Sequence, residues 1–192
     1  MEKNQLVIPG ISNPGTLACI SRSRKYTQYV KAVEGALANR CPFCHVNRDY
    51  NKIVFENTHC YAWHCNPPEA HTKFHFLIVP KRHVTDSTEL MNIELLWIYK
   101  NVPLKLMEEF GFKSRGVLIR DGDATLSAGT IEHLHAHIMV PDGTGRVESP
   151  FYKGSEAEEE STARAIVFEK LRQGIPTDSL STAEKALVKD RV

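Results

Sequence analysis

Short runs in which apolar and polar residues alternate predict five β-strands in this chain. Such alternation is typical of a half-buried strand, because successive side chains point to opposite faces. Breaks typical of hairpins separate several of the runs, which favours a mostly antiparallel sheet. The predicted strands cover residues 53–56, 60–63, 74–79, 116–120 and 131–140.

Apolar residues spaced three and four apart predict helices between and beside these strands. Residues 22–39 carry one such stripe ahead of the first strand. A second stripe begins near Asp86 and Glu89, which have the spacing of a helix-starting capping box, and it continues past Pro103. Proline lacks an amide proton, so we expect a kink or break near Asn101.

The net charge and the lack of long apolar runs bear on which partners and which cellular location we expect. The chain has 24 Lys and Arg residues against 23 Asp and Glu, so no strong net field favours nucleic acid as a partner. A local basic pocket could still hold phosphate. No apolar run approaches the roughly 18–20 residues of a membrane span, and the first residues lack a secretory pattern. We therefore expect a cytoplasmic protein without a membrane partner.

Five cysteines are an odd number for a chain without secretory context. This disfavours a framework of disulfides and favours metal ligation or plain burial. Cys41 and Cys44 stand in a Cys-Pro-Phe-Cys segment, a spacing at which one turn can offer two thiolates to one ion. The same spacing also occurs in redox-active and in merely buried pairs.

Three histidines mark the last predicted strand. His133, His135 and His137 recur at every second position, with aliphatic residues between them. On a strand, the three imidazoles would share one face and the aliphatic side chains the other. Neutral imidazole is a nitrogen nucleophile near physiological pH, which suits attack on phosphorus. A metal-binding strand is the alternative that this pattern leaves open.

The segment His133-Leu-His-Ala-His-Ile-Met139 resembles the signature of the histidine-triad (HIT) family of nucleotide-binding hydrolases and transferases. An upstream segment from His75 to His83 ends in Pro-Lys-Arg-His and is similar to the family's Pro-Lys-x-His strand. The resemblance covers roughly residues 41–140. It implies an α+β fold, a HIT-like antiparallel sheet of about five strands with packed helices, and a homodimer.

The chain is longer than the region of resemblance, and helical extensions are expected at both ends. Its 192 residues, 42% of them hydrophobic, suffice for one domain with a sizeable core. We predict an N-terminal arm and helix over residues 1–40 and a HIT-like catalytic domain over residues 41–142. Residues 143–192 are predicted to form a helical extension packed on the same domain, with helices starting near Ser155 and Ser181.

The resemblance assigns unequal roles to the histidines. In proteins similar to this one, the middle histidine attacks the α-phosphate of a nucleotide and forms a nucleotidyl-histidine intermediate. Here that nucleophile is His135, while His137 and His75 are implied to contact the phosphate or the leaving group and to supply a proton.

The implied function is a phosphohydrolase that acts on a dinucleoside polyphosphate or a nucleoside phosphoramidate. A nucleotidyltransferase or phosphorylase of the same family is one alternative. A nucleotide-binding module with little turnover is the other.

Zinc-bearing members of the family are similar at four positions. There the cysteine pair is completed by the histidine of Pro-Lys-x-His and by the first histidine of the triad. The resemblance therefore implies a structural zinc held by Cys41, Cys44, His83 and His133, a closed set of four ligands. His45 is a competing ligand, although its position beside Cys44 makes the geometry awkward.

The chain departs from the family where the ribose is usually bound. The acid that commonly grips the ribose hydroxyls is missing from residues 62–67. Asn66 or His64 could hydrogen-bond a sugar in its place. An asparagine that many members place before the triad could be replaced by Asp121 or Asp123, and such an acid could either repel phosphate or serve the ribose.

Two residues directly before the triad are further candidates for substrate contact. Gly129 stands where the family often has a glutamine, and glycine still allows the backbone to approach a phosphate closely. Thr130 lies where the family commonly has a phosphate-contacting hydroxyl. It could equally be an ordinary strand residue.

Overall fold

The computed structural model describes residues 8–9, 20–122, 124, 129–149 and 155–192, with side chains in the last range from residue 159 onward. Most of the predicted N-terminal arm therefore lies outside the described residues, as does Asp123. Within the described part, no helix is both long and apolar enough to cross a membrane. The predicted division of the chain at residues 40 and 142 stays a prediction.

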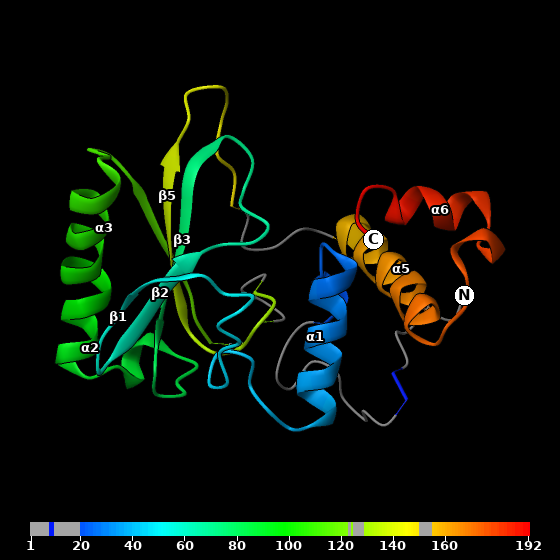
Figure 1. Ribbon diagram of the computed structural model, residues 1–192, viewed down its shortest axis with the longest axis horizontal. Helices are drawn as coiled ribbons and strands as arrows, with labels where there is room; N and C mark the ends of the chain where they lie inside the picture. Colours follow the sequence, from blue (N-terminus) through cyan, green and yellow to red (C-terminus); the bar gives the residue numbers. More distant parts are fainter. Residues whose placement is uncertain (1–7, 10–19, 123, 125–128, 150–154) are drawn as a thin grey trace.

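A five-stranded antiparallel sheet forms the centre of the molecule, in the order β1-β2-β3-β5-β4 (Figure 1). The first four predicted strands are confirmed, with ends displaced by at most two residues. Together with the helices, the sheet confirms the predicted α+β fold. The strands are β1 Ile53–Glu56, β2 Cys60–His64, β3 Thr72–Pro80, β4 Gly116–Arg120 and β5 His135–Pro141.

The last strand starts later than its sequence pattern predicts. The expected start was residue 131, but β5 begins at His135. Two hydrogen bonds tie the preceding residues to the end of β3 and the chain after it: a ring nitrogen of His133 donates to the Pro80 carbonyl, and the Leu134 amide donates to the Val84 carbonyl. The prediction that all three histidines share one strand was therefore wrong for His133.

One face of the sheet is covered by a helix that contains a π-helical turn (Figure 1). It consists of α2 Asn92–Leu96, the π-helical turn η3 Trp97–Asn101 and α3 Val102–Phe110. The Val102 amide donates to the Trp97 carbonyl five residues back. Pro103 has no amide proton to continue the regular ladder. The chain nevertheless stays helical from Asn92 to Phe110, so no break occurs near Asn101, and the irregularity there is the π-helical turn.

The capping box that was expected to start this helix instead caps a separate short turn. Asp86 and Glu89 close a short 3-10 turn, η2 Ser87–Glu89, and the backbone is extended again at Leu90. The helix proper begins after Met91, whose amide donates to the Glu94 carboxylate.

The main hydrophobic core lies between the sheet and this helix. Among its buried residues are Phe76, Ile78, Ile98, Val102, Leu106, Leu134, Ala136 and Ile138.

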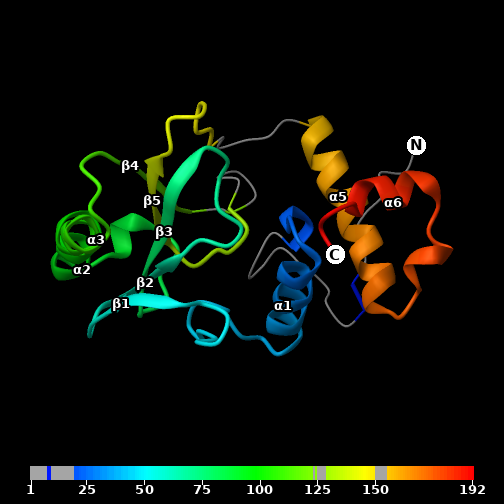
Figure 2. The ribbon, with the colours of Figure 1, turned by 45° about the horizontal axis from the view of Figure 1, so that its top comes forward.

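The two extensions pack on each other beyond the opposite face of the sheet (Figures 1 and 2). They supply α1 Tyr26–Leu37, preceded by the short turn η1 Ile20–Arg22, together with α5 Ser155–Arg172 and α6 Thr182–Val188. A second turn, η4 Thr177–Ser179, joins the last two helices. The predicted terminal helices are thus confirmed.

A second hydrophobic cluster holds these helices together. It includes Tyr29 and Val33 of α1 and Phe168 of α5, all fully buried, and the Tyr29 hydroxyl donates to the Glu169 carboxylate at 2.8 Å. Helix α1 belongs to this cluster rather than to the main core. Helix α1 and the C-terminal helices therefore form one packed layer beside the sheet.

Candidate functional site

Three buried histidines meet on the sheet face that α2 and α3 leave uncovered. His135 and His137 project from β5 on the side opposite Ala136 and Ile138, which lie in the main core. His75 comes from the neighbouring strand β3, and its Nε2 lies 2.8 Å from Nδ1 of His137. None of the three side chains is more than 6% exposed. Strand pairing thus brings the three predicted catalytic residues together.

Hydrogen bonds fix which nitrogen of each ring carries a proton. Nδ1 of His135 lies 2.8 Å from the His133 carbonyl, which can only accept, so this nitrogen donates and Nε2 keeps its lone pair. The Glu69 amide donates to Nδ1 of His75 at 3.0 Å, so a neutral His75 carries its proton on Nε2. That proton is donated to Nδ1 of His137, which leaves the His137 proton on Nε2.

Burial keeps these rings uncharged. It lowers the pKa of His135 to about 4, with a further contribution from the Arg120 guanidinium and against the hydrogen bond to His133. It lowers the pKa of His75 to about 4, assisted by Arg24 and Arg120, and the pKa of His137 falls well below its usual value for the same first reason. At neutral pH the site therefore presents one imidazole lone pair and one imidazole N–H.

The neutral state of His75 predicts a loss of stability in acid. In the unfolded chain, His75 binds a proton below about pH 6.5, whereas in the folded chain it binds one only below about pH 4. Between these two values, each pH unit of acidification lowers the free energy of unfolding by up to about 1.4 kcal/mol. Urea unfolding at pH 7 and pH 5 should show a loss about 1–2 kcal/mol larger for the wild type than for His75→Asn. Equal losses would contradict a neutral His75.

A cavity of about 530 Å³ lies against these histidines. Strands β2, β3, β4 and β5 contribute to it, and η1 and α1 of the N-terminal extension contribute as well. His135 and His137 line the cavity, together with three of the predicted substrate contacts: Asn66, Gly129 and Thr130. The segment before β5 thus reaches the same space as the catalytic strand.

The remaining candidates for the missing ribose acid lie elsewhere. The Asp121 carboxylate accepts hydrogen bonds from the amide and the hydroxyl of Ser87, and Asp121 is not among the residues that line the cavity. Its contact with substrate stays a prediction. The His64 ring packs on Phe76 at 4.6 Å between centroids, and on Phe110, on the α3 side of the sheet.

The cavity is also lined by charged residues that were not among the sequence candidates, Arg22, Arg24, Arg120 and Glu69 among them. Arg22 and Arg24 enter it from the N-terminal extension, Arg120 from the end of β4, and Glu69 from the loop before β3. Arg120 pairs with His135 in the register of β4 and β5. The basic run that starts at Arg22 was a signal in the sequence, but only the packing of the extension shows that it faces the histidines.

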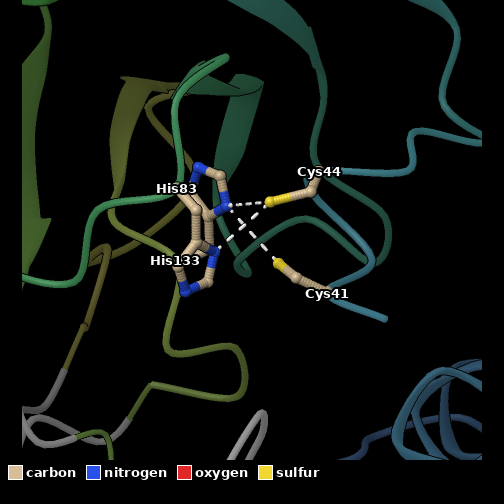
Figure 3. A group of neighbouring side chains, drawn as sticks. All are labelled: Cys41, Cys44, His83 and His133. Atoms are coloured by element: carbon tan, nitrogen blue, oxygen red, sulfur yellow. Dashed lines mark hydrogen bonds between the residues drawn. The ribbon is translucent and has the colours of Figure 1, made fainter. Parts of the chain in front are cut away.

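The four predicted metal ligands also meet. Their ligand atoms lie within 4.8 Å of one another (Figure 3). Cys44 Sγ lies 3.3 Å from Nδ1 of His83 and 3.5 Å from Nδ1 of His133, and Cys41 Sγ lies 3.4 Å from the latter. Zinc bond lengths of about 2.3 Å to sulfur and 2.0–2.1 Å to nitrogen place neighbouring ligands of a tetrahedron about 3.6 Å apart. The geometry therefore fits one tetrahedral ion.

The surroundings prepare these groups for a cation. His133 donates its Nε2 proton to the Pro80 carbonyl at 2.9 Å, which leaves Nδ1 unprotonated and directed at the thiols. Burial and the neighbouring Cys41 raise the pKa of Cys44 to about 12, an unfavourable state for a thiolate that a bound cation would reverse. His45 is not part of this group, and its Nδ1 lies 3.3 Å from the Cys41 carbonyl.

Comparison with known structures finds similar chains of low identity. An HIT family protein from Bacillus anthracis is 22% identical, with 72% of this chain and 96% of that chain covered and a TM-score of 0.46. A zinc-bound histidine triad family protein from Mycobacterium smegmatis is 20% identical, with coverage of 71% and 97% and a TM-score of 0.44. Plasmodium falciparum diadenosine triphosphate hydrolase is 18% identical, with coverage of 67% and 81% and a TM-score of 0.42.

The comparison with protein families is the stronger finding. The family model described as the HIT domain matches residues 47–144, just over half of the chain. The match spans β1 to β5 and therefore contains all three histidines of the triad as well as His75. The chain belongs to the HIT domain family.

Proposed function

We propose that this protein is a phosphohydrolase that acts at the α-phosphate of a nucleotide through a nucleotidyl-histidine intermediate on His135. One observation carries the proposal: the Nδ1 proton of His135 is held by the His133 carbonyl, so the Nε2 lone pair is the nucleophilic position beside the cavity. Attack by this nitrogen forms a P–N bond and breaks the bond from phosphorus to the leaving group.

The neighbouring residues suit the two sides of such a reaction. The Nε2 proton of His137 is available to the departing oxygen or nitrogen, and His75 holds His137 in the tautomer that carries it. Gly129, Thr130 and Asn66 are proposed as substrate contacts because they line the same cavity. Water then attacks the intermediate, which releases the mononucleotide and restores the His135 lone pair.

The products of adenylated substrates test this function. Diadenosine tetraphosphate and adenosine phosphoramidate should both give AMP, and the same products should form when inorganic phosphate is added. Formation of ADP on adding phosphate would instead identify a phosphorylase. Turnover no faster than that of His135→Ala on every such substrate would favour a nucleotide-binding module and contradict the proposed hydrolase.

We further propose that Cys41, Cys44, His83 and His133 hold a structural zinc ion. The set offers four ligands to a tetrahedral ion, which leaves no open position for a reacting group. Its place supports a structural role: Cys41 and Cys44 belong to the segment after α1, and His133 directly precedes β5. The ion would tie that segment to the catalytic strand.

A homodimer is the remaining proposal. Strand β4 stands at the end of the sheet order with Val117 41% exposed, and the adjoining helix exposes Leu96, Tyr99 and Leu104. An open strand edge beside apolar side chains suits pairing with a second copy. Light scattering should give twice the mass of one chain, and Val117→Lys should shift it toward one chain, unlike Leu37→Lys on α1. A wild type with the mass of one chain would contradict the dimer.

A further inference from the structure

Two guanidinium groups approach the catalytic imidazoles from different elements. Arg120 ends β4, and its Nη1 lies 3.4 Å from Nε2 of His137. Arg24 follows η1 and lines the same cavity. Both charges act on His75, because after burial they are the two largest causes of its lowered pKa. Positive charge is therefore concentrated beside His137.

Arg24 is held in place by the loop before β3. Its guanidinium donates to the Glu69 carboxylate at 3.1 Å and to the Pro67 carbonyl at 3.0 Å. A guanidinium has five N–H donors, so these two bonds fix the group without using all of its donors. In the same loop, the Glu69 amide donates to Nδ1 of His75, so the position of Arg24 is coupled to the tautomers of His75 and His137.

The contact between Arg120 and His137 is informative because both groups present protons. The proton of His137 is on Nε2, and a guanidinium nitrogen is always a donor. Two donors at 3.4 Å are stabilised when one anionic oxygen accepts from both. Burial, together with repulsion from Arg24 and Arg22 and against the attraction of Glu69, lowers the pKa of Arg120, and a bound anion would offset that repulsion.

Arg22 completes the arrangement from beneath the segment before the triad. It is 5% exposed, and its guanidinium donates to the carbonyls of Ala124 and Gly129. These bonds fix the backbone next to Thr130, where the α-phosphate is expected. All three arginines line the cavity, and the bonds of Arg22 to the backbone make it a positioning residue.

We propose that Arg24 and Arg120 form a subsite for a second phosphate group, next to the α-phosphate attacked by His135. The assignment rests on the proposed function and deepens it. The subsite would favour substrates whose leaving group carries further phosphates, or acceptors that are themselves phosphates, over substrates with a neutral leaving group. Arg24 belongs to the N-terminal extension, so this selectivity is supplied by a part of the chain outside the region that matches the HIT domain.

Two sources can supply this phosphate. In a dinucleoside polyphosphate it is the β-phosphate of the leaving group, whose bridging oxygen departs with both bond electrons and takes the His137 Nε2 proton. As a free acceptor it is inorganic phosphate, whose oxygen forms the new P–O bond while the P–N bond to His135 breaks. The second route yields a nucleoside diphosphate.

Binding of tripolyphosphate to the full chain, measured by isothermal titration calorimetry, tests the subsite without any turnover. Arg24→Gln should weaken binding at least tenfold. Glu69→Gln keeps the backbone amide that holds His75 but removes the competing carboxylate, so it should tighten binding about threefold or more. Arg48→Gln removes an exposed ion pair with Glu56 at a residue that does not line the cavity, so it should leave the affinity unchanged.

Opposite signs for the Arg24 and Glu69 variants support the subsite. It is overturned if the wild type does not bind tripolyphosphate at millimolar concentration, or if both variants change the affinity in the same direction. Because this readout needs no catalysis, it can fail or succeed independently of the proposed hydrolase.

Kinetics then separate the two sources. For Arg24→Gln, kcat/KM should fall at least tenfold more on diadenosine tetraphosphate than on adenosine phosphoramidate if the leaving group occupies the subsite. If inorganic phosphate occupies it, the wild type should form ADP when phosphate is added, which would identify a phosphorylase with this subsite in place of the proposed hydrolase, and Arg24→Gln should form at least tenfold less ADP. Equal losses on both substrates together with no formation of ADP would overturn the assignment.

Discussion

His135→Ala is expected to lower kcat/KM on an adenylated substrate by about 10⁴-fold or more, because it removes the atom that forms the covalent bond. The neighbouring residues cannot replace it. The His137 Nε2 position carries a proton rather than a lone pair, and His75 directs its Nε2 proton at His137. Substrate affinity should change little, because the cavity is otherwise intact.

Two further variants show whether this loss is specific to the nucleophile. His137→Ala should lose less activity on a substrate with a good leaving group, because its role is to supply a proton. His64→Ala, a control on the α3 side of the sheet, should retain wild-type kinetics. A His135→Ala variant that folds normally and keeps more than about one hundredth of the activity would show that another group attacks phosphorus.

Loss of the proposed zinc ion is expected to have the largest effect on stability. Replacing Cys41 or Cys44 with alanine, or treating the protein with a chelator, should remove about one zinc per chain and lower the free energy of unfolding by more than about 3 kcal/mol. For a chain of this size, that loss corresponds to a fall of roughly 10 °C in Tm. Elemental analysis and thermal unfolding measure the two effects.

The metal should also affect catalysis indirectly. His133 is one of the proposed zinc ligands, and the His133 carbonyl accepts the proton that orients His135. We therefore expect metal removal to lower kcat about tenfold, less than the loss of the nucleophile. Cys60→Ala, a change in the main core, should retain the zinc. A wild type with no zinc, or with more than one tightly bound metal, would contradict the proposed site.

The sequence predicted local structure well where local chemistry determines it. Alternating side chains located β1 to β4, and the missing amide proton of Pro103 pointed to an irregularity near Asn101, which is a π-helical turn rather than a break. It failed where contacts distant in the sequence decide the structure. His133 continues the alternation of β5, but its ring is held by the Pro80 carbonyl and faces the cysteines. The strand therefore begins only at His135.

The catalytic site shows the same division. The spacing of the histidines and cysteines identified candidate catalytic and metal groups, and the structure brings both sets together. The spacing could not identify Arg24 or Glu69 as lining residues. Their place in the cavity depends on how α1 packs with α5 and on the loop before β3, and neither follows from a local pattern.

Mass spectrometry of the protein quenched in acid-free denaturant within milliseconds of mixing with diadenosine tetraphosphate or adenosine phosphoramidate tests the central claim most directly. We predict one adenylyl group per active chain, mapped by fragmentation to His135 and absent from His135→Ala. An adduct on a different residue, or AMP formed in a single turnover with no adduct at any time, would show that His135 is not the nucleophile.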